Sequence, residues 1–194
     1  LWDLRSRKRT NGGVKRGAAV LTSAISPDGQ LLCVAAVDGL AMFEFTPRSS
    51  DGEGGGVEEP HCEPLWEIAT GTRFAGVAFS RDSRLVAAVR WETGQLEIRD
   101  ARSNSAVKVI EDFPAVQHGS GNSCLAFSEE VLAVTGRWDK PNTKQVRLYA
   151  VESDDFVELA TLEVPGDCAH NLAMSPDGTK LAVGMAGPST SGYR

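Results

Sequence analysis

The chain has 194 residues, of which 41% are hydrophobic and 24% charged, and its formal net charge is −6. That length is enough to bury the core of one domain. An acidic surface repels phosphate, so the composition argues against a general nucleic-acid-binding protein. No run of about 18 apolar residues occurs, which argues against a membrane-spanning helix. The charge is uneven, because residues 1–17 hold six basic residues and one acidic residue, so they carry +5 and the remainder carries −11.

Four similar segments recur along the chain. They share a serine, at positions 26, 80, 128 and 175, which gives spacings of 54, 48 and 47 residues. The first and last serines begin the sequence Ser-Pro-Asp-Gly, which favours a tight turn because Pro presets φ, Asp bonds the backbone ahead and Gly adopts positive φ. Such a period predicts a repeated supersecondary unit. A second apolar run follows each serine, at Leu31–Val37, Leu85–Val89, Val131–Thr135 and Leu181–Val183.

Each complete unit is predicted to contain four strands. The alternation of Val77 and Phe79 around Ala78 is typical of a half-buried first strand. Third strands are expected at Leu40–Phe45, Gln95–Arg99 and Gln145–Val151, and fourth strands at Leu65–Ile68, Ala106–Ile110 and Phe156–Leu162. One four-stranded sheet cannot bury both faces alone, so the units must stack, and radial stacking into a β-propeller leaves few open edges.

These features resemble the WD40 repeat. The resemblance covers almost the whole chain and rests on the serine turns, the repeat spacing and Leu1-Trp2-Asp3-Leu4 as the end of a third strand. Residues 96–100 and 146–150 occupy the same position in later units. The resemblance implies an all-β fold, a β-propeller fragment of four-stranded antiparallel blades, with about three complete blades and two partial ones. A looser relative with a generic propeller repeat is the alternative.

The family's buried hydrogen-bond network is only partly represented. His118 lies ten residues before its serine, where the family has a histidine, whereas the other units have Arg16, Thr70 and Pro165 there. Only Trp2 keeps the family's tryptophan. The resemblance implies a network through the remaining candidates, which are His118, Thr135, Asp139 and Tyr149.

The spacing also divides the chain into blades. Residues 1–17 are expected to end a preceding blade, and residues 166–194 to start a further one. The complete blades are expected at 18–70, with an acidic, Gly-rich insertion at 46–60, and at 71–114 and 115–165. Since closed propellers have about four to eight blades, we expect a longer parent protein. The insertion is predicted to be a mobile loop, either a regulated tether or a tolerated surface insertion.

Two similar tripeptides are the candidate partner-binding site. Arg90-Trp91-Glu92 and Arg137-Trp138-Asp139 each follow a second strand, so adjacent blades would present them at equivalent places. The resemblance implies that these loops open onto the face where partners commonly dock, and Trp and Arg are enriched among binding hot spots. The alternative is that both tryptophans fill gaps between blades and both arginines pair with nearby acids.

Catalytic and metal-binding motifs are absent from the sequence. No phosphate-binding loop, zinc-protease motif or nucleophile elbow occurs, and the three histidines are not spaced as metal ligands, so no cofactor or metal is expected. Arg5-Ser6-Arg7-Lys8-Arg9 fits a solvated hairpin loop, or a nuclear-import or phosphate-binding patch. Cys33 and Cys124 lie in apolar runs and are expected to be buried, reduced thiols of a cytoplasmic or nuclear protein.

The sequence therefore predicts a WD40-type scaffold without catalytic activity. Its expected partners are other proteins or peptides in a multi-protein complex, without direct contact to nucleic acid or membrane. The alternatives are a lactonase-like or quinoprotein-like propeller that acts as an enzyme or small-ligand binder, with polar groups such as His170 and Asn171 facing the channel, or a gene fragment without a stable fold.

Overall fold

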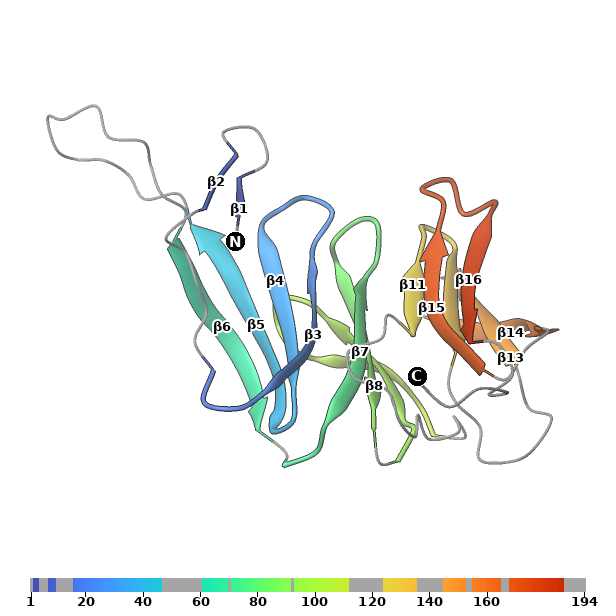
Figure 1. Cartoon of the computed structure of the whole chain (residues 1–194), viewed down its shortest axis with the longest axis horizontal. Coiled ribbons are helices and arrows are strands. Elements are labelled where there is room, and N and C mark those ends of the chain that lie inside the picture. The colour runs from blue at the N-terminus through green and yellow to red at the C-terminus, as the bar shows by residue number, and fades with distance from the viewer. Residues whose placement is uncertain are drawn as a thin grey trace, which may run out of the picture.

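A computed structural model describes residues 2–3, 7–9, 16–46, 61–69, 71–91, 93–111, 124–135, 145–152, 155–164 and 168–186. These residues form three four-stranded antiparallel sheets and two two-stranded ones (Figure 1). The described part of the chain contains no helix, and so no helix that could cross a membrane. The fold is all-β, as predicted, with strands in simple meander order.

Each four-stranded sheet is one blade, named here by its order. The first blade comprises β3 (Val20–Ile25), β4 (Leu31–Ala36), β5 (Gly39–Thr46) and β6 (His61–Ala69). The second comprises β7 (Phe74–Phe79), β8 (Leu85–Arg90), β9 (Leu96–Asp100) and β10 (Ala106–Ile110). The third comprises β11 (Leu125–Phe127), β12 (Val131–Thr135), β13 (Gln145–Glu152) and β14 (Asp155–Glu163).

Two hairpins flank these blades. The N-terminal hairpin pairs β1 (Trp2–Asp3) with β2 (Lys8–Arg9), and the C-terminal hairpin pairs β15 (Cys168–Met174) with β16 (Leu181–Ala186). They lie at opposite ends of the array (Figure 1). Successive first strands contact one another, β3 with β7, β7 with β11 and β11 with β15, so the sheets stack radially around their first strands. This arrangement is that of a β-propeller.

The second strand of each blade is buried on both faces, which explains its continuous apolar sequence. In β4, Leu31, Cys33 and Ala35 pack towards the second blade, where they meet Val86 and Ala88 of β8. The alternate residues of β8 pack in the other direction: Leu85, Ala87 and Val89 contact the third blade. Full burial of a Leu or Val side chain contributes about 1.5–3 kcal/mol, so these stripes are a main source of cohesion between blades.

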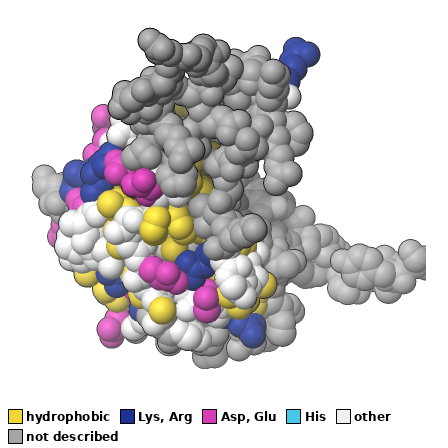
Figure 2. All heavy atoms as spheres, turned by 90° about the vertical axis from the view of Figure 1, so that its left-hand side faces the viewer, with side chains coloured by type: hydrophobic (Ala, Val, Ile, Leu, Met, Phe, Trp, Pro, Cys, Tyr) yellow, Lys and Arg dark blue, Asp and Glu magenta, His cyan; other side chains and the backbone are white. Residues whose placement is uncertain are grey.

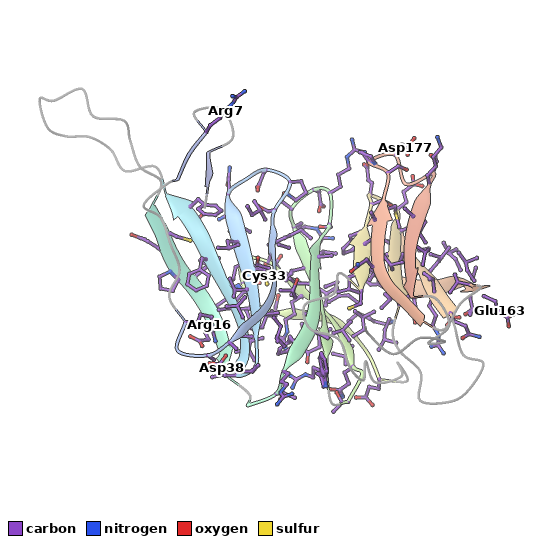
Figure 3. All side chains as sticks on the ribbon, viewed as in Figure 1. Arg7, Arg16, Cys33, Asp38, Glu163 and Asp177 are labelled. Carbon is purple, nitrogen blue, oxygen red and sulfur yellow. The ribbon has the colours of Figure 1, made fainter. Side chains whose placement is uncertain are left out.

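Both cysteines predicted to be buried are buried free thiols. Cys33 lies in the middle of the first blade (Figure 3), and desolvation raises its pKa far above the usual range. Burial also raises the pKa of Cys124, to about 12. By contrast, hydrophobic side chains are uncovered among charged ones at the end of the molecule seen in Figure 2, which is the left-hand side of Figure 1.

Candidate functional site

The predicted partner-binding residues of the second blade lie where β8 ends. Arg90 is the last residue of β8, and its guanidinium pairs with Glu97 of the adjacent strand β9. It also donates to the Thr72 hydroxyl at 3.3 Å and lies 5.2 Å from the centroid of the Phe74 ring. Its contacts within the blade therefore hold the Arg90 side chain, which is 19% exposed.

Glu97 is the buried centre of this cluster. Its side chain is 4% exposed, and its second carboxylate oxygen accepts a hydrogen bond from Arg99 Nε at 2.9 Å and forms an ion pair with Arg99 Nη2 at 2.8 Å. Arg99 in turn donates to the carbonyl oxygen of Asn104, a residue with φ of 61° in the turn that follows β9. Two guanidinium groups thus share one carboxylate. This set, which we call the Arg90–Glu97–Arg99 cluster, ties the end of β8, just before Trp91, to the neighbouring strand β9.

Trp91 is half-buried. It packs against the core between the second and third blades, and its backbone N–H donates to the Arg73 carbonyl oxygen at 2.8 Å. Core packing therefore holds the Trp91 side chain, and this hydrogen bond holds its backbone. The rest of the predicted site, Glu92 and the tripeptide Arg137-Trp138-Asp139, lies outside the described residues, so its role stays a prediction.

Only two members of the predicted hydrogen-bond network are described, and they lie apart. Thr135 is fully buried, sits opposite Val146 and donates to the Gln145 carbonyl oxygen at 3.3 Å. Tyr149 is opposite Leu132, three positions along the same strand pair, which is about 10 Å. Burial raises the pKa of Tyr149, and the nearby Arg147 opposes that shift. His118 and Asp139 lie outside the described residues, so the network itself remains a prediction.

Arg16 has a structural role that its sequence position alone did not assign. It occupies the place of the family's histidine in the first blade, and its guanidinium binds Asp38 at 2.9 Å and Glu67 at 2.8 Å (Figure 3). Its side chain is only 5% exposed. Burial lowers the pKa of Arg16, but the two carboxylates outweigh burial and raise it overall. An arginine–carboxylate pair thus fastens the loop before β3 to the turn after β4.

The turns between first and second strands repeat one hydrogen-bond pattern at the other end of the blades. Ser26, Ser80 and Ser175 each donate to the aspartate two residues on, Asp28, Asp82 and Asp177, at 2.5 Å. Burial raises the pKa of Asp82, but the bonds from Ser80 and the Arg84 backbone outweigh burial and lower it overall. These turns also join neighbouring blades, because the Asp28 N–H donates to Ser83 Oγ at 3.1 Å.

The third blade has a shorter turn, and a pocket of about 230 Å³ lies beside it. The Ser128 N–H bonds to the Val131 carbonyl oxygen, three residues on, whereas the equivalent bond from Ser80 reaches Leu85. The charged residues that line the pocket are Arg81, Glu129, Glu130 and Asp177, so its lining is net negative. Such a lining disfavours phosphate and carboxylate ligands. Among the described residues, no group of three His, Cys, Asp or Glu side chains could hold a metal ion.

Comparison with solved structures places this fold among WD40 propellers. A chain in the crystal structure of a mitotic checkpoint complex is similar over 90% of this chain, with a TM-score of 0.57 and 19% sequence identity. The WD40 repeats of RRP9 are similar over 82% of it, with a TM-score of 0.54 and 18% identity. The chain spans 47% and 43% of the lengths of these two structures. No family model matches the sequence, and no curated protein is significantly similar to it.

Proposed function

We propose that this chain, whose fold is a WD40-like β-propeller, is a scaffold that binds partner proteins or peptides through the loops between its second and third strands. In this role it acts by binding, without catalysis and without a cofactor, as part of a multi-protein complex in the cytoplasm or nucleus. The similarity to a chain of a mitotic checkpoint complex supports protein partners in general. The partner-binding residues proposed are Arg90, Trp91, Arg137 and Trp138.

One observation carries the proposal. Trp91 keeps part of its indole in solvent while the rest packs on the core, and the Arg90–Glu97–Arg99 cluster fixes the end of the strand that precedes it. A rigid, partly exposed tryptophan loses little conformational entropy when a partner covers it. Tryptophan is also one of the residues most enriched among binding hot spots. Within this site Arg90 acts mainly as a positioning residue, since Glu97, Thr72 and Phe74 already hold its guanidinium.

The proposal is tested by replacing Trp91 and Trp138 with Ala and quantifying the proteins that the purified chain captures from a cell extract. Specific partners should be lost from the double variant and retained by Leu65→Ala, a control whose side chain is 37% exposed on the outer strand β6. The melting temperature should change little, and a fall of many degrees would instead assign the tryptophans to the packing between blades. Equal capture by both variants would show that the tryptophans are not the binding site.

A further inference from the structure

Arg73 lies directly opposite Trp91 at the end of the second blade. The terminal pair of the two strands is Phe74 of β7 and Arg90 of β8, in antiparallel register. The next pair along the backbone is therefore Arg73 and Trp91, and the Trp91 N–H donates to the Arg73 carbonyl oxygen at 2.8 Å. Opposite residues of an antiparallel pair lie on the same face of the sheet, with Cβ atoms about 4.5–5.5 Å apart. Arg73 and Trp91 are thus neighbours on one face.

That face is the one directed towards the third blade. Trp91 packs against the hydrophobic core between the second and third blades. The preceding pair lies on the other face, because successive side chains of a strand alternate. Phe74 accordingly packs in the core shared with the first blade, and the Arg90 guanidinium lies 5.2 Å from the centroid of its ring. Arg73 therefore lies on the same side as Trp91, and Arg90 lies on the opposite side.

The two arginines differ in what they offer to a partner. The Arg90 side chain is 19% exposed, and its guanidinium is engaged by Glu97 and Thr72 within the blade. Arg73, by contrast, is exposed. A partner can reach the Arg73 guanidinium without disrupting the Arg90–Glu97–Arg99 cluster. The cation that accompanies the half-buried indole of Trp91 on the binding face is thus Arg73, a residue that the repeated tripeptides do not include.

The loop that follows Trp91 is held by its own hydrogen bonds. The Gly94 N–H donates to the Arg90 carbonyl oxygen at 3.0 Å, and the Gln95 N–H donates to Thr93 Oγ1 at 3.3 Å. The Arg90 N–H in turn donates to the Gln95 carbonyl oxygen at 2.8 Å. A surface that is already ordered loses little conformational entropy when a partner binds.

We propose that Arg73 and Trp91 form one binding unit for an extended segment of a partner protein, in which an aspartate or glutamate lies two positions from a large apolar residue. The apolar side chain covers the indole, and the carboxylate pairs with the guanidinium, a pairing that is frequently bidentate. Side chains two positions apart in an extended segment point to the same side, about 7 Å apart. The inference rests on the proposed function, because it requires partners to dock at Trp91.

The charges of the first blade set the direction in which an acidic segment extends. At the same end of that blade, Arg16 is outnumbered by Asp38 and Glu67, which are 46% and 54% exposed (Figure 3). The loop that contains Arg73 adjoins them, because the Gly71 N–H donates to the Asp38 carbonyl oxygen at 3.3 Å. Since like charges repel, an acidic segment bound at Arg73 should extend away from the first blade, over the second.

The test is selection of a displayed library of short random peptides against the 194-residue chain and three variants. Trp91→Ala identifies the peptides that depend on the proposed site. Arg73→Glu reverses the charge beside Trp91. The control, Arg81→Glu, makes the same change at an exposed arginine in the turn at the other end of β7 and β8. Far-UV circular dichroism and the melting temperature check that each variant is folded.

Peptides that bind the chain and the control but not Trp91→Ala should be enriched in Asp or Glu two positions from a large apolar residue. Arg73→Glu should instead select Lys or Arg at that position. Trp91-dependent peptides without an acidic preference, or an acidic preference that survives Arg73→Glu, would overturn this inference and leave the proposed function standing. If no peptide depends on Trp91, the proposed function fails and this inference fails with it.

A double-mutant cycle on one selected peptide measures the pair itself. Fluorescence anisotropy gives the Kd of the peptide, and of its analogue with the carboxylate changed to an amide, for the chain and for Arg73→Gln. Each single change should weaken binding about threefold to fivefold, the size expected for one exposed ion pair, and the two together should weaken it no further. Independent, additive losses would show that Arg73 does not contact the carboxylate and would overturn the proposed pairing.

Discussion

Replacing Glu97 should destabilise the chain strongly, because its buried carboxylate pairs with two arginines. Glu97→Gln removes the carboxylate shared by Arg90 and Arg99, whose side chains are only 19% and 17% exposed, and leaves two guanidinium groups close together without a counter-charge. Breaking a buried ion pair by removing one partner costs about 3–5 kcal/mol. Because both arginines keep some contact with water, we expect the lower end, about 3 kcal/mol.

Urea unfolding measures this loss. The midpoint should fall while the slope stays unchanged, since the surface exposed on unfolding is nearly the same. The control is Glu67→Gln, a partner of Arg16 that is 54% exposed, for which a loss of about 0–1 kcal/mol is expected. The double variant Arg90→Gln/Glu97→Gln should recover part of the loss, because it restores the charge balance. A Glu97→Gln midpoint equal to that of the control would refute the reasoning that this cluster is a buried structural unit.

Three further outcomes are expected. Gly39→Ala should lower the free energy of unfolding by at least about 2 kcal/mol, because a Cβ there would lie 2.0 Å from the Ile68 carbonyl oxygen. An unchanged urea midpoint would contradict the strand contact. In native protein a thiol reagent should label Cys124 far more slowly than the half-buried Cys62, and equal rates would show that Cys124 is accessible. The pKa of Asp82 is lower in the folded chain than in the unfolded one. The stability that Asp82 contributes is therefore complete above about pH 4 and is lost as the pH falls through its folded pKa. Asp82→Asn should reduce the loss of stability at acidic pH, and an unchanged acid limb of the stability–pH curve would contradict this.

The repeat pattern was sufficient to predict the fold because each level of it reflects one physical constraint. The second strands read as continuous apolar runs since both of their faces are covered by neighbouring blades. The sequence could predict the serine turns because Ser26 and Asp28 are only two residues apart and form a hydrogen bond within the turn. Strand ends were less exact: β6 begins at His61, four residues before the predicted Leu65, because its outer end pairs with the end of β5.

The candidate site was less predictable because its contacts depend on register between strands. Arg90 and Glu97 are seven residues apart and meet only because β8 and β9 pair in one particular register. The contact between Arg16 and Glu67 likewise joins residues far apart in the sequence, 51 positions. The position of Arg16 ten residues before Ser26, where the family has histidine, was the one signal in the sequence. The pocket beside Ser128 depends on a turn that is shorter than the equivalent turns of the other blades. The aligned repeats show this difference in length, but the difference alone does not predict a pocket.

The most direct test of the proposed scaffold function is site-specific photo-crosslinking in cells. A photoreactive phenylalanine analogue placed at position 91 should form covalent adducts with partner proteins, and the same analogue at position 65, on the outer strand β6, should form few. Adducts at position 91 that disappear when Trp138 is replaced by Ala would support a shared surface on adjacent blades. Adducts at position 65 alone would contradict the account and place the binding surface on the outer strands of the blades.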